Sequence, residues 1–289
     1  MRVIVRMVVV TAIAAIGSTQ SLWAQSDQRS VYASVVDKAG APVTGLSAGE
    51  FVVREDAVAR EVLRVSTATE PLQIALLVDT SQAIDPHTLD LRTALLAFFK
   101  QMAGKHEIAL IGTGERPTVL ADYTKDPARL EKALGGVFAR TGSGTYLMEA
   151  IVEAGNGLRR RKAVRPTIVA ITARGPEFSE RHHDQVLGDL RESGAALHTF
   201  ILRPPGPVRD DQSDRELELS IAEGTKLTGG RREDLLTSMA LTDRLQSLGN
   251  ELNQQYQITY ARPAKLIPPK TLEVGAKRQD VTVRARRWP

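Results

Sequence analysis

Apolar and polar residues alternate near both ends of the chain. The alternation runs from about residue 31 to residue 68, with segments such as 31–36 and 51–56 separated by short turns. It returns after residue 255 in three short runs, at 256–260, 271–274 and 281–284. A period of two residues with short turns is typical of antiparallel strands. Because so small a sheet is rarely stable alone, we expect the strands of the two ends to pack into one β domain.

The middle of the chain has a different pattern. Residues 74–78 form a continuous apolar run, which is expected of a strand buried on both faces of a parallel sheet. Further apolar runs then alternate with amphipathic stretches of helical period. We therefore predict strands at 74–78, 108–111, 118–120, 167–171 and 196–202, the third being a hairpin partner of the second, and helices at 87–102, 127–134, 146–160, 181–192 and 232–253.

Together these patterns predict an α/β fold: a doubly wound, mostly parallel sheet inserted in a small antiparallel β domain built from both chain ends. The expected boundaries are an N-terminal β segment at residues 25–70, the α/β domain at 71–253 and a C-terminal β segment at 254–289. A Pro-rich stretch at 204–207 is expected to form an exposed loop.

The first 24 residues predict a signal peptide. Arg2 and Arg6 give a positively charged start before an apolar run at 7–16, and small and polar residues follow as far as Ala24. This order is typical of secretory signals, and the run is about half the ~20 residues that a membrane-spanning helix needs. An uncleaved anchor is the alternative, because Leu22 is a poor residue at position −3 from a cut after Ala24. We expect an exported chain, periplasmic or secreted, with no membrane span after signal cleavage.

Composition narrows the possible functions. The chain has no cysteine, which excludes disulfides, zinc ribbons and a thiol nucleophile. Its formal net charge of +4 is evenly spread and only 4% of its residues are aromatic, so we expect no nucleic-acid binding. No Gly-x-Ser-x-Gly motif occurs, and the Gly-rich stretch at 142–145 lacks the lysine of a phosphate-binding loop. We therefore expect a protein that is not an enzyme.

Oxygen-bearing side chains follow the predicted buried strands. Asp79 and Ser81 come directly after the strand at 74–78, and Thr145 lies in the Gly-rich stretch before the helix at 146–160. The carboxyl ends of parallel strands meet at one edge of a sheet, so we expect these three side chains to converge. Such a set suits a hard cation such as Mg²⁺ or Mn²⁺. Alternatively, Asp79 and Ser81 cap the start of the next helix by accepting backbone N–H groups.

This arrangement resembles the von Willebrand factor type A (VWFA) domain and its metal-ion-dependent adhesion site. Asp79 and Ser81 match the first two positions of that family's Asp-x-Ser-x-Ser motif, and Thr145 matches its loop threonine. Ala83 stands where the second serine belongs, and Ala173 stands where the family places an aspartate. The resemblance therefore implies a degenerate site, at which Mg²⁺ or Mn²⁺ binds weakly or not at all.

The flanking segments are similar to the exported bacterial VWFA-related domain family. The similarity spans nearly the whole mature chain, in residues 42–46, 71–79, 228–230, 255–260 and 281–287. It implies a binding module that recognises an unknown protein partner through loops at the carboxyl edge of the sheet. The residues expected to contact that partner are Gly142, Ser143, Gly144 and Tyr146. The alternative is a structural envelope scaffold with no metal or ligand function.

Overall fold

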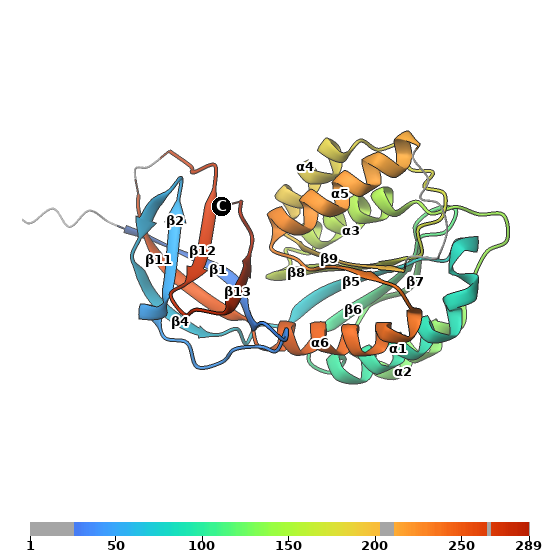
Figure 1. Cartoon of the computed structure of the whole chain (residues 1–289), viewed down its shortest axis with the longest axis horizontal. Coiled ribbons are helices and arrows are strands. Elements are labelled where there is room, and N and C mark those ends of the chain that lie inside the picture. The colour runs from blue at the N-terminus through green and yellow to red at the C-terminus, as the bar shows by residue number, and fades with distance from the viewer. Residues whose placement is uncertain (1–25, 203–210, 265–266, 289) are drawn as a thin grey trace, which may run out of the picture.

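The computed structural model describes residues 26–202, 211–264 and 267–288. The predicted signal peptide at 1–24 and the predicted loop at 204–207 lie outside the described residues. A β-sandwich and an α/β domain lie side by side (Figure 1). In the part of the chain that the structure describes, no helix has the length and hydropathy needed to cross a membrane.

Two antiparallel sheets form the β-sandwich, and each contains strands from both ends of the chain. Their orders are β13–β1–β11–β4 and β12–β2–β3. The strands are β1 (Ser26–Asp37), β2 (Phe51–Glu55), β3 (Val58–Arg60), β4 (Val62–Thr67), β11 (Tyr256–Pro263), β12 (Leu272–Ala276) and β13 (Val281–Ala285). Ala33 of β1 pairs with Tyr256 of β11 on one side and with Ala285 of β13 on the other. The predicted packing of the two chain ends is confirmed.

The alternation along β1 separates two environments. Val31, Ala33 and Val35 are buried between the two sheets. The residues between them face the α/β domain. The Gln255 amide donates a hydrogen bond to the Ser34 hydroxyl at 3.2 Å, and the Tyr32 ring contacts the guanidinium group of Arg165. One face of β1 therefore builds the sandwich core, and the other builds the junction between the two parts.

The α/β domain has one six-stranded sheet with the order β10–β9–β8–β5–β6–β7. All neighbouring pairs are parallel except β6 and β7, which form the predicted antiparallel hairpin. The strands are β5 (Leu72–Val78), β6 (Glu107–Gly112), β7 (Thr118–Thr124), β8 (Arg165–Thr172), β9 (Ala196–Leu202) and β10 (Arg232–Leu235). The predicted fold class is confirmed.

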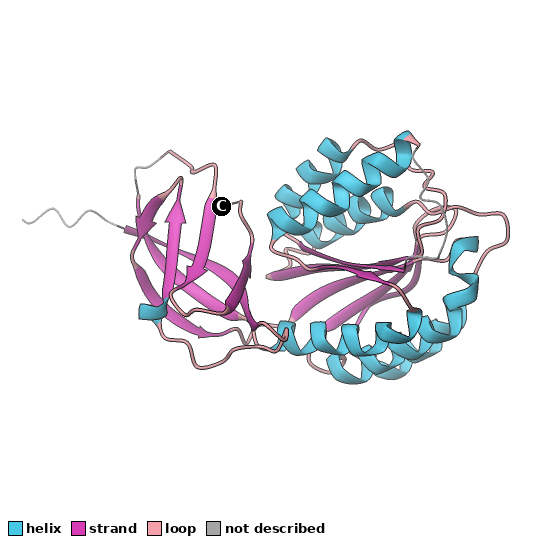
Figure 2. Ribbon diagram, in the orientation of Figure 1, coloured by secondary structure: helices cyan, strands magenta, loops and turns pink. Residues whose placement is uncertain are grey.

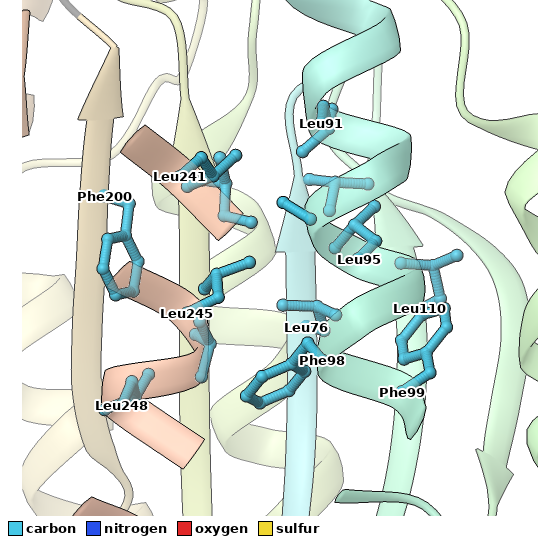
Figure 3. Packing of buried hydrophobic residues seen from close by; sticks show 14 of the residues in the cluster. Leu76, Leu91, Leu95, Phe98, Phe99, Leu110, Phe200, Leu241, Leu245 and Leu248 are labelled. Atoms are coloured by element: carbon cyan, nitrogen blue, oxygen red, sulfur yellow. The ribbon is translucent and has the colours of Figure 1, made fainter. Parts of the chain in front are cut away.

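Helices cover both faces of this sheet (Figure 2). On one face lie α1 (Thr88–Met102), α2 (Pro127–Ala133) and α6 (Leu241–Asn253), and on the other α3 (Leu147–Arg160), α4 (His183–Ser193) and α5 (Gln212–Thr228). Short 3-10 helices are η1 (Ala48–Glu50), η2 (Gln82–His87), η3 (Leu134–Gly136) and η4 (Ser238–Ala240). In the first layer, apolar side chains of α1 and α6 pack on strand residues such as Leu76 and Phe200 (Figure 3).

The predicted helix at 232–253 is wrong in its first third. Residues Arg232–Leu235 form strand β10, which pairs with β9 and buries Leu235, and α6 begins only at Leu241. Leu236 and Met239, apolar residues of the predicted helix, are 89% and 78% exposed. The structure also contains α5, for which the pattern gives no prediction; its buried face includes Ser220, Thr225 and Thr228, which weaken the apolar stripe.

The end of the chain returns from the sandwich to the α/β domain. The Arg287 N–H donates to the Leu227 carbonyl oxygen at the end of α5, at 2.8 Å. Trp288 packs against the apolar core between the sheet and helices α3 to α5. Arg284 of β13 donates to the buried Glu251 carboxylate of α6 at 2.9 Å. These contacts hold the sandwich against the amino edge of the sheet, opposite the edge at which the predicted site lies.

Candidate functional site

The loops predicted to carry the site meet at the carboxyl edge of the sheet. Thr113, directly after β6, donates its N–H to the Val78 carbonyl oxygen at 2.9 Å. Gln82 of η2 accepts the Gly142 N–H through Oε1 at 2.9 Å. The loops after β5 and β6 and the Gly-rich loop before α3 therefore form one hydrogen-bonded cluster.

Asp79 is fully buried at the end of β5, and both of its carboxylate oxygens have protein donors. Oδ1 accepts the Ser81 N–H at 2.8 Å. Oδ2 accepts the Ala173 N–H at 2.9 Å and the Thr172 hydroxyl at 3.2 Å. The carboxylate thus ties the loop after β5 to the loop after β8. The capping interpretation proposed that both Asp79 and Ser81 accept backbone N–H groups at the start of the next helix. The Asp79 carboxylate does accept one there, at the start of η2.

Ser81 is also fully buried, but its hydroxyl has no hydrogen-bond partner among the described residues. It is the N-cap residue of η2, yet its side chain makes no capping hydrogen bond. A Cβ atom added at Gly175 would lie 3.5 Å from Ser81 Oγ and only 2.7 Å from Ala83 Cβ. The loop after β8 is therefore packed directly onto Ser81 and Ala83, and a glycine is required at the contact.

Thr145 is fully buried in the Gly-rich loop. Its hydroxyl is 3.1 Å from the hydroxyl of Thr113, and its backbone N–H donates to the Pro176 carbonyl oxygen at 2.8 Å. No hydrogen bond joins Thr145 to Asp79 or Ser81 within the described ranges. The structure places all three residues in one loop cluster, with each side chain in its own environment.

Glu177 is a buried carboxyl group in the same cluster, 4% exposed. It accepts the Leu147 N–H at the start of α3 at 3.2 Å and also bonds the Ser179 hydroxyl. Burial raises the pKa of Glu177 to about 8, although these hydrogen bonds act in the opposite direction. The carboxyl group is therefore directed at the first turn of α3.

The residues present do not fit a bound hard cation well. Asp79 is the sole carboxylate of the predicted set, and each of its oxygens already has a donor. Ala83 and Ala173 supply no side-chain oxygen. No group of three or more His, Cys, Asp or Glu side chains in the described part of the chain is arranged to hold a metal ion. Among the residues of the predicted set, the unpartnered Ser81 hydroxyl favours a further ligand.

We expect Mg²⁺ titrated into the purified chain to bind no more tightly than the millimolar range. Affinity at oxygen sites depends on the number of charged ligands, and here one carboxylate would have to exchange three protein donors for the ion. Isothermal titration calorimetry measures this, with Asp85→Ala as a control that removes an exposed acid. Micromolar binding that is lost in Asp79→Ala and kept in Asp85→Ala would contradict the expectation.

The predicted partner-contacting residues differ in their accessibility. Gly142 is exposed, Ser143 and Tyr146 are partly exposed, and Gly144 is buried. Gly144 lies beneath the Phe178 ring, whose nearest atom is 2.6 Å from where a Cβ would be. Phe178 also makes an edge-to-face contact with Tyr146, with ring centroids 6.1 Å apart. Gly144 therefore shapes this surface from below.

Phe178 and Phe138, in loops of this cluster, are exposed among the described residues, at 50% and 48%. Arg140 lies over the Phe138 ring, 5.9 Å from its centroid, and its carbonyl oxygen accepts the Ser143 N–H at 3.2 Å. We call Phe138, Arg140, Gly142 and Phe178 the Phe178 patch. Sequence reasoning proposed the surrounding loops but neither phenylalanine, because a lone aromatic in a predicted loop carries no periodic signal.

Comparison with known proteins gives a sequence match within the α/β domain. The sequence model of the von Willebrand factor type A domain matches residues 74–175, which run from β5 into the loop after β8. No curated protein sequence matches the chain.

Solved structures agree with this match at the level of the fold. A von Willebrand factor type A structure from Catenulispora acidiphila is 13% identical, with a TM-score of 0.53 over 90% of this chain and 74% of that one. The pilus adhesin SpaC from Lactobacillus rhamnosus GG is 11% identical, with a TM-score of 0.50 over 82% of this chain and 47% of that one. Proximal thread matrix protein 1 from the mussel byssus is 11% identical, with a TM-score of 0.50 over 74% and 50%. Residues 74–175 of this chain therefore match the von Willebrand factor type A domain in sequence, and the α/β domain has the fold of these structures.

Proposed function

We propose that this chain is an exported, non-enzymatic protein-binding module that recognises its partner through the Phe178 patch without a bound metal ion. The observation that carries the proposal is the state of Asp79: its buried carboxylate is bonded to the protein, while Phe138 and Phe178 in loops of the same cluster remain exposed. Export is supported by the order of basic, apolar and small residues at 1–24.

The chemistry of the patch supports protein recognition. Interfaces are enriched in aromatic residues and arginine, and a few such side chains carry most of the binding energy. Phe178 is held in place by Tyr146 and by its close approach to Gly144, so little conformational freedom is lost when a partner covers it. Arg140 pairs with Glu115 at 2.9 Å, which adds a polar rim.

Capture of a partner from envelope extract tests the proposal. The immobilised chain should retain the same partner with and without EDTA, and Phe178→Ala should reduce its retention about thirtyfold, which corresponds to a loss of about 2 kcal/mol. Val58→Ala is the matched control, since Val58 is 54% exposed on β3 of the sandwich. Capture that EDTA abolishes would show metal-mediated adhesion instead. Absence of any partner would favour the scaffold alternative.

A further inference from the structure

A cavity of about 240 Å³ lies at the junction of the β-sandwich and the α/β domain. Its walls come from β1, from residues 284–286 and from residues at the amino edge of the sheet, including 163–167. Val164, which is 60% exposed, is among the lining residues, so the cavity communicates with solvent. The cavity is therefore separate from the Phe178 patch, which lies at the carboxyl edge.

Three arginines line this cavity: Arg165, Arg284 and Arg286. Arg284 is neutralised, since it donates to the Glu251 carboxylate at 2.9 Å. Arg165 is 4% exposed, and the Glu70 carboxylate interacts favourably with its positive charge. Its guanidinium group lies over the Tyr32 ring, 5.3 Å from the ring centroid. Its terminal nitrogens donate to the carbonyl oxygens of Glu70 and Leu252 and to the Gln255 side chain.

One nitrogen of the Arg165 guanidinium group makes no hydrogen bond with the described residues. This nitrogen is Nε, which is buried. A buried donor without a partner costs free energy, and nearly all such donors in folded proteins are paired with protein, water or a ligand. The Arg165 side chain lines the cavity but Nε itself is enclosed, so a ligand in the cavity would meet the positive charge of Arg165 and not this donor.

Arg286 carries a charge that nothing described neutralises. Across residues 26–202, 211–264 and 267–288, its guanidinium group makes no ion pair or hydrogen bond, and burial lowers its pKa, with only partial compensation from Tyr260. Glu55 lines a neighbouring hollow with Arg286, but its carboxylate is engaged by Arg60 at 3.0 Å and by the Tyr260 hydroxyl at 3.0 Å. A partly buried cation without a counter-ion is unfavourable and calls for an anion.

We propose that this cavity binds a small anion carrying a carboxylate or phosphate group, held by Arg286 and attracted by the positive charge of Arg165. Guanidinium groups match the oxygens of both anions in geometry and charge. The site connects β1 and the residues after β13 with the start of β8, so a bound anion also fixes how the sandwich sits on the α/β domain.

Thermal unfolding of the purified chain in inorganic phosphate, in citrate and in NaCl of equal ionic strength tests the proposal. We expect a saturable rise in Tm of about 5 °C with phosphate or citrate and none with NaCl. The two anions distinguish a phosphate site from a carboxylate site. Arg286→Gln should weaken the effect at least tenfold, whereas Arg278→Gln, which removes an exposed arginine paired with Glu50, should leave it unchanged. Equal effects in wild type and Arg286→Gln, or none in wild type, would overturn the proposal.

The stability of Arg286→Gln without added anion gives a second, independent result. Arg286 lies near the C-terminal end of α4, where its Nη1 is 3.6 Å from the position a Cβ at Gly194 would take. If Arg286 serves only that helix end, the variant lowers Tm. If Arg286 instead serves to bind an anion, Arg286→Gln removes an unneutralised charge and leaves Tm unchanged or raises it.

Chemical modification avoids reliance on a variant. Phenylglyoxal labels exposed arginines, and mass spectrometry reports the rate at each position. Saturating phosphate or citrate should slow labelling of Arg286 several-fold and leave Arg278 unaffected. An unchanged rate at Arg286 would contradict the proposal.

Discussion

Removal of residues 256–289 is expected to unfold β1 and β4, while the sheet of the α/β domain stays folded. β11 lies between β1 and β4 and is hydrogen-bonded to both, so its loss leaves each strand without its main neighbour. It also removes Ile258 and Tyr260 from the sandwich core. A few isolated strands cannot bury enough apolar surface to remain ordered.

Hydrogen exchange measured by mass spectrometry checks this expectation. Residues 31–37 and 62–67 should lose protection in the truncated chain, and 72–78 should keep it. The substitution Ile258→Ala perturbs the same core less than the truncation does. It should lower the unfolding free energy by about 2 to 5 kcal/mol, because it leaves a cavity at a fully buried position. Val58→Ala is the matched control, since Val58 is 54% exposed on β3. Full protection of residues 31–68 after truncation would show that the N-terminal strands are stable alone.

The second large effect concerns Glu177. The folded chain holds its pKa at about 8, against an ordinary value of 4.5. Between these two pH values the unfolded chain has lost a proton that the folded chain keeps, so stability falls as pH rises from about 4.5 to about 8. Each pKa unit corresponds to about 1.4 kcal/mol, so the contribution lost across this window is about 4 to 5 kcal/mol. Below pH 4.5 the contribution is fully present.

Glu177→Gln removes this pH dependence, because a glutamine keeps the hydrogen-bonding shape of the protonated acid without a titrating proton. Denaturant unfolding at several pH values between 4 and 9 should give a difference between wild type and variant that shifts in favour of the variant as pH rises. Glu153→Gln, a change at an exposed acid on α3, should follow the wild type. If the difference in unfolding free energy between wild type and Glu177→Gln were the same at all pH values, Glu177 would not be the group responsible for the pH dependence.

The sequence predicts the fold well because its two hydrophobic periods are clear. The continuous apolar run at 74–78 and the mostly apolar run at 196–202 correspond to strands β5 and β9, which are buried on both faces. The alternation near the chain ends corresponds to the sandwich, where one face of each strand is buried. The failure at β10 has a physical cause: a four-residue strand at the sheet edge has too few positions to show a period.

The site was less predictable because its geometry depends on contacts between loops. The sequence places Asp79 and Thr145 at the correct edge, but it does not show that Asp79 accepts three donors from the protein. It also does not show that Glu177 faces α3, since that depends on how the loop after β8 folds back. Tertiary contacts of this kind leave no local pattern.

The pairing of β1 with β11 has a consequence for the order of folding during synthesis. Ser30 and Thr259, whose hydroxyls are 3.1 Å apart, are separated by 229 positions in the chain. The α/β domain is continuous in sequence and can fold as soon as it leaves the ribosome, whereas the sandwich must await the final strands. β1 is thus translated long before its neighbours β11 and β13, and its open hydrogen-bonding edge needs protection from other nascent chains until they arrive.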